Sequence, residues 1–341
     1  MTVRVAVVGA GSWMTRFHAP AVVAHPGARL VAVCDPDLAA AEALARHCGA
    51  RAVGDVAALI ADGDFECAIV SSPHATHRPI TEAILHSGRH VLVEKPLATN
   101  SDDAFALVRL ASERGLHLSV GYTSQHSPSA ATVRDWVRTQ IGSLLQVSIE
   151  FSSRAGALFA AAQLDASATY SARNGGGQGH TQLSHAIAML AWVTGEQADS
   201  VAAFTEARGL DIDVLDALAF RLEGGAIGVA SSTGSLSSQL PVTQRLRYIG
   251  ERGIVDQDIL FGTAQLQRED GSYVAAARDH LRPSYPAEAP ARAFLDLVLG
   301  NGPNVSPPEP AAVAVAFVEA MNESAASGTR VDVRRLRNGT A

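Results

Sequence analysis

The chain has 341 residues, too many for one compact core, and this length predicts two domains. Hydrophobic residues make up 47% and charged residues 18%, which suits a well-packed globular protein and excludes an intrinsically disordered one. The net charge of −7 comes without a basic block or stripe, so we expect no nucleic-acid partner.

The chain has three cysteines, Cys34, Cys48 and Cys67. Their number is odd and they lack CxxC spacing, which favours small buried thiols over a disulfide framework or a zinc site. The N-terminus runs straight into a strand without a leader pattern, and no apolar stretch is long enough to span a bilayer. We therefore expect a cytoplasmic protein without a membrane partner.

Strands and helices alternate through the first 120 residues. Val3–Val8 is a near-continuous apolar run, typical of a strand buried on both faces of a parallel sheet. Further strands are expected at Leu30–Cys34, Ala52–Val53, Cys67–Val70, His90–Val93 and Leu116–Val120, with helices near Trp13–Ala24, Asp37–Cys48, Val56–Ala61, Thr76–His86 and Ser101–Arg114. The alternation predicts an α/β domain at residues 1–121, built on a doubly wound parallel sheet with right-handed crossovers.

The pattern changes after Gly121 to alternating segments typical of antiparallel strands. They are expected at Leu144–Phe151, Val201–Glu206, Leu215–Leu222, Ala226–Ser231, Arg245–Ile249 and Gly253–Asp256, and helices at Pro128–Thr139, Gln178–Val193, Ala289–Leu299 and Pro310–Ala326. We expect an α+β domain at residues 122–341 with a mostly antiparallel open sheet, and a loosely attached charged tail after Gly328.

The turn after the first strand reads Gly9-Ala10-Gly11-Ser12-Trp13-Met14. Two glycines match the G-x-G-x-x-G phosphate-binding pattern, while Met14 replaces the third glycine, whose role is close helix–strand packing. The helix that follows directs its free N–H groups at the phosphates. The turn predicts a dinucleotide-binding Rossmann domain.

Asp35 ends the second strand, where this fold places the carboxylate that binds the adenosine ribose. Such a carboxylate accepts hydrogen bonds from the 2′- and 3′-hydroxyls and repels the extra phosphate of NADP. Neither Pro36 nor Asp37 supplies a cation that would reverse this preference. We expect NAD as the cofactor, with NADP less favoured.

Three further motifs occur in order along the chain: Ser71-Ser72-Pro73 with His74 and His77, Glu94-Lys95-Pro96, and Gly175-Gly176-Gly177 leading to His185. With these motifs the chain resembles the Gfo/Idh/MocA oxidoreductases, which include glucose–fructose oxidoreductase and inositol dehydrogenase. The resemblance covers essentially the whole length. It implies two domains in the order expected above.

The resemblance implies that Lys95 lies beside the nicotinamide and contacts the reacting oxygen. An ammonium there stabilises negative charge on oxygen and can relay its proton. The same resemblance makes His185 the residue that accepts or donates the proton of the substrate hydroxyl. A histidine satisfied within a buried helix is the alternative for His185. Pro96 is expected to follow a cis or otherwise constrained peptide bond.

Position 181 departs from the family pattern. Many members carry an aspartate four residues before the histidine, whereas this chain has Thr181, and Ala188 replaces a second aspartate. A neutral hydroxyl does not stabilise an imidazolium as a carboxylate does. Thr181 and His185 share a face of an α-helix at i, i+4. His180 is the candidate that shares the proton transfer.

The resemblance also assigns residues to the cofactor side: Gly9, Gly11, Ser12, Trp13, Met14, Asp35, Ser71, Ser72, Pro73, His74, His77, Glu94, Lys95, Pro96 and Gln125. His74 and His77 favour cofactor-side packing over metal ligation, because no third ligand lies nearby in the sequence, and no metal is expected. His18 matches a recurrent family position near the cofactor. Arg173 and Asn174 are candidates for binding sugar hydroxyls, with a solvated loop as the alternative.

The leading hypothesis is an NAD-dependent dehydrogenase that acts on a secondary alcohol of a sugar, cyclitol or related polyol. One alternative is a glycosidase that retains NAD and oxidises its substrate transiently. The other is a dinucleotide-binding regulator without turnover. An open antiparallel sheet usually seeks a partner, so we expect a homodimer or homotetramer.

Overall fold

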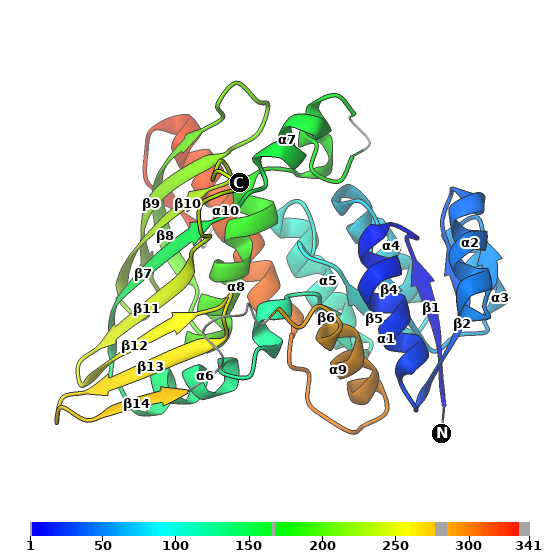
Figure 1. The fold of residues 1–341 in the computed structure, drawn as a ribbon, viewed down its shortest axis with the longest axis horizontal. Coiled ribbons are helices and arrows are strands. Elements are labelled where there is room, and N and C mark those ends of the chain that lie inside the picture. The colour runs from blue at the N-terminus through cyan, green and yellow to red at the C-terminus, as the bar shows by residue number, and fades with distance from the viewer. Residues whose placement is uncertain (1, 166–167, 277–284, 334–341) are drawn as a thin grey trace. The chain divides into compact units, whose positions relative to one another are not determined.

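The computed structural model describes residues 2–165, 168–276 and 285–333, which form two compact units (Figure 1). The first unit takes in residues 1–98, 103–126 and 286–309, and the second takes in residues 99–102, 127–285 and 310–341. Residues 286–309, which the sequence pattern places in the second domain, thus pack with the first unit.

The first unit is built on a six-stranded sheet in the order β3-β2-β1-β4-β5-β6, in which every described pair is parallel. The strands are β1 (Val3–Val8), β2 (Ala28–Cys34), β3 (Arg51–Val53), β4 (Cys67–Val70), β5 (His90–Val93) and β6 (Leu118–Val120). The helices are α1 (Ala19–Ala24), α2 (Leu38–Cys48), α3 (Val56–Asp62), α4 (His77–His86), α5 (Ser101–Glu113) and α9 (Ala289–Val298). The expected doubly wound parallel sheet is confirmed.

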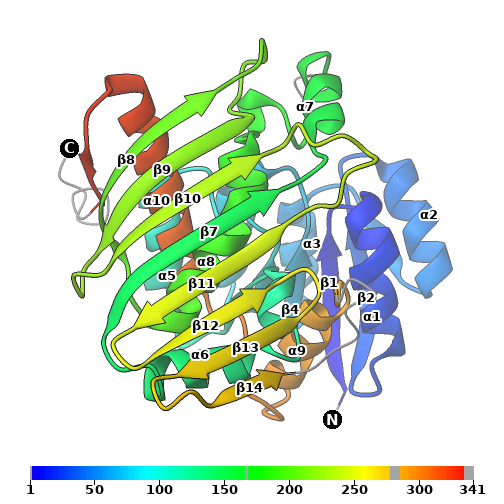
Figure 2. The ribbon, with the colours of Figure 1, turned by 60° about the vertical axis from the view of Figure 1, so that its left-hand side comes forward.

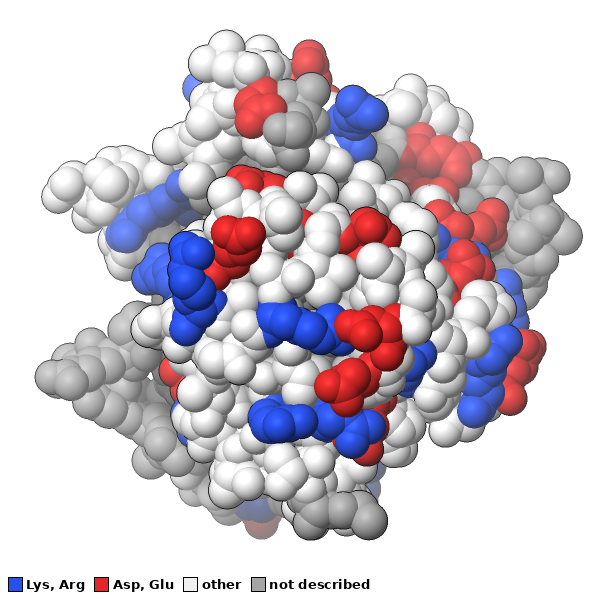
Figure 3. All heavy atoms as spheres, turned by 90° about the vertical axis from the view of Figure 1, so that its right-hand side faces the viewer, with Lys and Arg blue, Asp and Glu red and all other residues white. Residues whose placement is uncertain are grey.

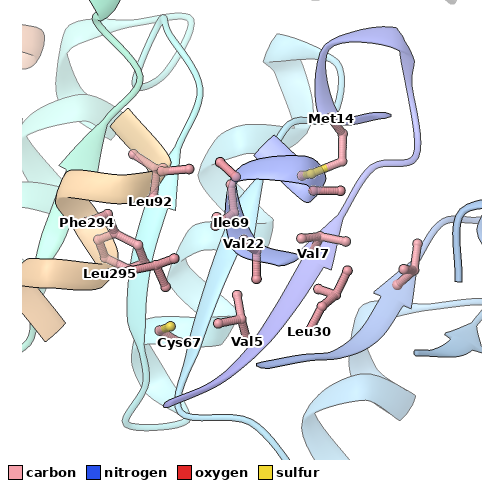
Figure 4. Close-up of a cluster of buried hydrophobic side chains, with 14 of the residues drawn as sticks. Val5, Val7, Met14, Val22, Leu30, Cys67, Ile69, Leu92, Phe294 and Leu295 are labelled. Carbon is pink, nitrogen blue, oxygen red and sulfur yellow. The ribbon is translucent and has the colours of Figure 1, made fainter. Parts of the chain in front are cut away.

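The core of this unit explains why residues 286–309 belong to it. Phe294 and Leu295 of α9 pack into the same buried cluster as Val5 of β1 and Ile69 of β4 (Figure 4). Burial of two large apolar side chains stabilises that position of α9 by about 3–6 kcal/mol. The sequence of α9 gives no indication that it returns to the first unit.

The second unit holds a nine-stranded sheet in the order β14-β13-β12-β11-β7-β10-β9-β8-β15 (Figure 2). The strands are β7 (Leu144–Ser152), β8 (Ala198–Glu206), β9 (Leu215–Leu222), β10 (Ile227–Thr233), β11 (Gln244–Gly250), β12 (Gly253–Asp258), β13 (Thr263–Arg268), β14 (Tyr273–Ala276) and β15 (Val331–Asp332). Only the pair β7–β10 is parallel among the described pairs of this sheet. The mostly antiparallel sheet is confirmed, while β13, β14 and β15 extend it beyond the expected strands.

Four helices accompany this sheet, at α6 (Ala130–Thr139), α7 (Gly156–Gln163), α8 (Ser184–Thr194) and α10 (Pro308–Ser327). Helices α8 and α10 lie behind one face of the sheet in Figure 2. Each residue of α8 from Ser184 to Val193 is buried, as its apolar composition predicts. The short helix α7 has no counterpart among the expected elements. The expected loose attachment of the tail after Gly328 is wrong for its first residues, because Val331–Asp332 pairs with β8 and Val331 and Val333 are buried. The rest of that tail, from residue 334, lies outside the described residues.

The structure corrects the starts of two expected helices. Met14–His18 forms a π-helical turn before α1, and Gly179–Leu183 forms another before α8. Such turns occur often at functional sites because they re-aim side chains relative to a regular α-helix. All three cysteines are free thiols, as expected. No helix in the described part of the chain has the length and apolar character to cross a membrane.

Candidate active-site residues

In the turn after β1, Gly9 and Gly11 differ in why each is a glycine. Gly9 has φ 91°, and a Cβ there would overlap the carbonyl oxygen of Ser71, so only glycine fits the close approach of the two strand ends. A Cβ on Gly11, in contrast, would meet no protein atom within 4 Å. Neither backbone conformation nor internal packing therefore demands glycine at position 11. The open space beside it fits the approach of a pyrophosphate.

Asp35 follows β2 directly and turns its carboxylate toward the glycine turn. Oδ2 accepts a hydrogen bond from the Ala10 N–H at 2.7 Å, and Oδ1 accepts one from the Asp37 N–H at 2.9 Å. The side chain is only half-buried, so its remaining lone pairs are open to ribose hydroxyls. This geometry fits the ribose-binding role expected from the sequence.

Glu94 joins the glycine turn to the end of β5. Its buried Oε1 accepts hydrogen bonds from Trp13 Nε1 at 3.0 Å and from His18 Nε2 at 2.8 Å. Burial by itself raises the pKa of Glu94, but His18 and the charge and N–H of Lys95 outweigh it and lower this pKa. A Cβ on Gly121 would overlap the same carboxylate. Glu94 is therefore an ionised anchor packed between three segments.

Lys95 lies next to this anchor. Its backbone N–H donates to Glu94 Oε2 at 3.2 Å, and the Lys95–Pro96 peptide bond is cis. Burial lowers the pKa of Lys95, and the Glu94 carboxylate partly offsets this effect. The ammonium thus releases its proton more readily than an exposed lysine does.

His77 connects the two loops that follow β4 and β5. Its Nδ1 lies 2.6 Å from the Pro96 carbonyl oxygen, and its Nε2 lies 3.0 Å from the Ser72 carbonyl oxygen. The ring is fully buried, and burial lowers its pKa in spite of both carbonyls and Glu94. A neutral imidazole donates from one nitrogen only, so neutral His77 donates to one of these carbonyl oxygens while its other nitrogen lies against the second.

The other residues expected on the cofactor side of the first unit differ in exposure. Ser12 is exposed, whereas His74 and Gln125 are buried and Ser71 is half-buried. Met14 is fully buried in the core cluster, where its side chain packs the helix onto the sheet (Figure 4). Met14 therefore fills the place of the third glycine by packing and does not present its side chain to a ligand. In the described part of the chain, no group of three or more His, Cys, Asp or Glu side chains is placed to hold a metal ion.

The second unit contains the two histidines that were predicted to transfer protons. His180 and His185 are each 8% exposed, on the π-helical turn and on α8 respectively. The Thr181 hydroxyl donates to the Gly177 carbonyl oxygen at 2.6 Å, so it serves the backbone of the turn. Burial lowers the pKa of His180, and the charges of Asp213 and Glu319 act in the opposite direction.

The loop before the glycine run contains one buried and one exposed residue of the two proposed to bind sugar hydroxyls. Asn174 is buried, and its amide donates to the Ala168 carbonyl oxygen at 2.9 Å. Arg173 is exposed, in agreement with the solvated alternative.

The sequence alone did not predict two features of the candidate site. The first is the contact of Glu94 with His18 and Trp13, which joins residues about 80 positions apart. The second is a pair of acids in the second unit, Asp213 and Asp216. Asp216 shares the inward face of β9 with Leu218, Phe220 and Leu222, and an acid in that alternation was the signal to notice.

Two family models match the chain. The model described as the oxidoreductase family with an NAD-binding Rossmann fold matches residues 3–122, and that of the GFO/IDH/MocA C-terminal domain matches residues 130–256. The chain belongs to the Gfo/Idh/MocA family. Its first domain is an NAD-binding Rossmann domain, which confirms the cofactor expected from the glycine turn and Asp35.

Curated relatives match part of the chain. Over 150 residues it is 40% identical to dTDP-3,4-didehydro-2,6-dideoxy-alpha-D-glucose 3-reductase of Streptomyces antibioticus, which covers 44% of this chain and 46% of the relative. Inositol 2-dehydrogenase of Rhizobium meliloti is 33% identical over 150 residues, covering 44% and 45% respectively. The matches span about half the length of these curated relatives.

Solved structures match the whole fold. GenD2 from gentamicin A biosynthesis, solved in complex with NAD, superposes with a TM-score of 0.78 at 26% identity, over 97% of this chain and 96% of that one. The family architecture thus extends over both units of the chain.

Proposed function

We propose that the protein is an NAD-dependent oxidoreductase that transfers a hydride between the nicotinamide and a secondary alcohol or ketone carbon of a sugar, cyclitol or related polyol. One observation carries this proposal: among 27 lysines and arginines, Lys95 is the only lysine of the chain. An arginine supplies a cation but does not release a proton at neutral pH, whereas a buried lysine does. An amine kept at this one position indicates proton chemistry.

Lys95 stabilises the negative charge that develops on the reacting oxygen and exchanges its proton with it. Its neighbour Glu94 keeps the ammonium form available in a buried environment. His185 is the second proton carrier in this proposal, with His180 and Thr181 supporting it. The bound nicotinamide supplies the hydride chemistry.

The residues that would hold NAD are those of the glycine turn, Asp35 and the loops after β4 and β5. Asp35 binds the ribose, and the N–H groups after Gly11 face the pyrophosphate. His77 keeps the loops of Ser72 and Pro96 in register beside the nicotinamide end. The names of the relatives, an inositol dehydrogenase and a deoxysugar reductase, support a cyclic polyol or sugar as the substrate class.

Absorbance of NADH tests the proposal. A panel of sugars, inositols and their oxidised forms is incubated with the protein and either NAD or NADP, and we expect cofactor reduction or oxidation with NAD. Glycoside cleavage without net NADH formation would favour the NAD-retaining glycosidase. Ligand binding without either reaction would favour the regulator.

We further propose that the protein works in the cytoplasm as a homodimer or homotetramer, without nucleic-acid or membrane partners. Apolar side chains are exposed on the sheet of the second unit, with Phe204 at 84%, Ile227 at 52% and Val229 at 49%. Exposed apolar side chains on strands of one sheet support self-association. On the face that Figure 3 shows, basic and acidic side chains are interspersed and form no basic stripe. Sedimentation equilibrium of the full chain measures the oligomeric state.

A further inference from the structure

Two acids of the second unit, the half-buried Asp213 and the buried Asp216, belong to the segment that packs against the histidine turn. Asp213 lies in the loop before β9, and Asp216 is the second residue of that strand. Both come about 30 positions after the histidines in the sequence, so only the fold brings them together.

Asp213 holds the backbone of the turn. Its Oδ2 accepts a hydrogen bond from the Gly179 N–H at 2.6 Å, and its carbonyl oxygen accepts one from the Gln178 N–H at 2.9 Å. Gly177 has φ 109°, and a Cβ there would overlap Asp213 Oδ1. The carboxylate is therefore seated against the backbone that leads into His180.

Gln178 fixes the same turn from its other side. Its amide donates to Ser232 Oγ at 2.8 Å, and its carbonyl oxygen accepts from Ser153 Oγ at 3.1 Å. Ser232 on β10 is also the direct cross-strand partner of Asp216. The turn and the acid pair thus belong to one buried polar network.

Asp216 lacks what an ionised buried carboxylate needs. It is 4% exposed, and neither of its oxygens receives a well-formed hydrogen bond in the described part of the chain. Burial, followed by the charge of Asp213, raises the pKa of Asp216 to about 9. At neutral pH Asp216 then keeps its proton.

The negative charge of Asp213 favours the protonated form of His180. Its Nδ1 is buried without a hydrogen-bond partner in the described residues, and the carboxylates whose charges act on it are Asp213 and Glu319. Thr181, which follows it, supplies only a hydroxyl already bonded to the backbone.

We propose that Asp213 is a positioning residue whose carboxylate holds the turn at residues 177–179 and stabilises the charged form of His180. From the proposed function this inference takes only the share of His180 in proton transfer. The acid pair supplies from another element the carboxylate that the helix lacks at position 181.

Proton NMR of the histidine Cε1–H signals tests the inference on the full chain without substrate, with His180→Gln identifying the signal of His180. Asp213→Asn is expected to lower the pKa of His180 by about one unit or more, because an opposite charge is lost at short range. Asp216→Asn is expected to leave it nearly unchanged, because the amide mimics the protonated acid. The matched control is Asp211→Asn, an exposed acid of the same loop. An unchanged His180 in Asp213→Asn, or an equal drop in both pair variants, overturns the proposal.

A second measurement needs no folded Asp213 variant. Infrared spectroscopy of the unmodified protein is expected to show a protonated carboxyl band at pH 7 that disappears as the pH rises through about 9. The band is expected to be missing in Asp216→Asn, and its absence from the unmodified protein at pH 7 overturns the proposal. Neither readout requires turnover, so failure of the proposed function and failure of this inference are separable.

Discussion

Glu94 is the residue on which the contacts of the first unit converge. A single buried oxygen accepts from Trp13 of the glycine turn and from His18 at the start of α1, and the other accepts from the Lys95 N–H. The carboxylate thus fixes the position of the lysine backbone and sets the charge environment of its amine.

Glu94→Gln is expected to lower the pKa of Lys95 further, because the negative charge that offsets burial is lost. Since Lys95 is the only lysine, reductive methylation with ¹³C-formaldehyde labels it and the N-terminal amine alone. Titration of the two ¹³C-methyl signals then gives its pKa directly. Glu82→Gln, a half-exposed glutamate on α4, is the control. A lysine signal that titrates identically in both variants would contradict this role of Glu94.

Asp35→Asn is expected to weaken NADH binding about 10-fold or more, because charge-assisted hydrogen bonds to the ribose are lost. The relative affinity for NADPH is expected to rise. Asp37→Asn keeps the N-cap of α2, which Asn fills as well as Asp, and is the matched control. Fluorescence titration with both cofactors measures the effect, and equal NADH affinity in the two variants would count against Asp35 as the ribose ligand.

Some residue roles can be predicted from the local sequence, whereas others depend on contacts between distant parts of the chain. The roles predicted for Gly9 and Asp35 follow from local rules of the strand–turn–helix unit, and the structure shows Asp35 bonded to the glycine turn and Gly9 packed against Ser71. Met14 is different, because its burial depends on a core that includes α9 from the far end of the chain. The Glu94–His18 contact likewise depends on the sheet order and has no local signature.

At the level of elements, the strand ends and the helix starts determine the site. The loops after β1, β4 and β5 leave neighbouring strands of one parallel sheet, whose carboxyl ends share an edge. His77, the first residue of α4, lies within hydrogen-bond distance of the carbonyl oxygens of two of these loops. The π-helical turns could not be predicted, because the residues of Met14–His18 and Gly179–Leu183 fit a regular α-helical pattern equally well.

His77→Leu is expected to destabilise the protein by about 1–3 kcal/mol, because a buried carbonyl oxygen loses its donor. NADH binding is expected to weaken as the loops of Ser72 and Pro96 lose their connection. Urea unfolding followed by circular dichroism measures the stability. His47→Leu, an exposed histidine on α2, serves as the control and is expected to change it by less than about 0.5 kcal/mol. Equal stabilities of the two variants would remove His77 as the connection between the loops.

For the whole molecule, the sequence predicted the two architectures, because long apolar runs and alternating segments report burial directly. It did not predict the discontinuous units, since the return of residues 286–309 depends on long-range packing. It also missed β13–β15, which are short strands of six, four and two residues.

Stability is expected to fall as the pH drops below about 6.5. Burial lowers the pKa of His77 and His180, and that of His126 to about 4. The unfolded chain then binds more protons than the folded one between these values, so acid favours unfolding, and His126 alone costs about 2 kcal/mol from pH 7 to pH 5. Urea unfolding at the two pH values measures the loss. His126→Gln is expected to reduce it, and an equal loss in that variant would contradict the assignment to His126.

The central claim is that Lys95 exchanges a proton during NAD-dependent hydride transfer, and Lys95→Arg tests it most directly. Arginine keeps the positive charge but not the exchangeable proton. NADH absorbance with the polyol panel compares the variant with the unmodified protein, after circular dichroism and NADH fluorescence show that folding and cofactor binding are kept. We predict turnover in the unmodified protein and a loss of about 100-fold or more in Lys95→Arg. Comparable rates in the two proteins, or no cofactor turnover by the unmodified protein with any polyol, would contradict the account.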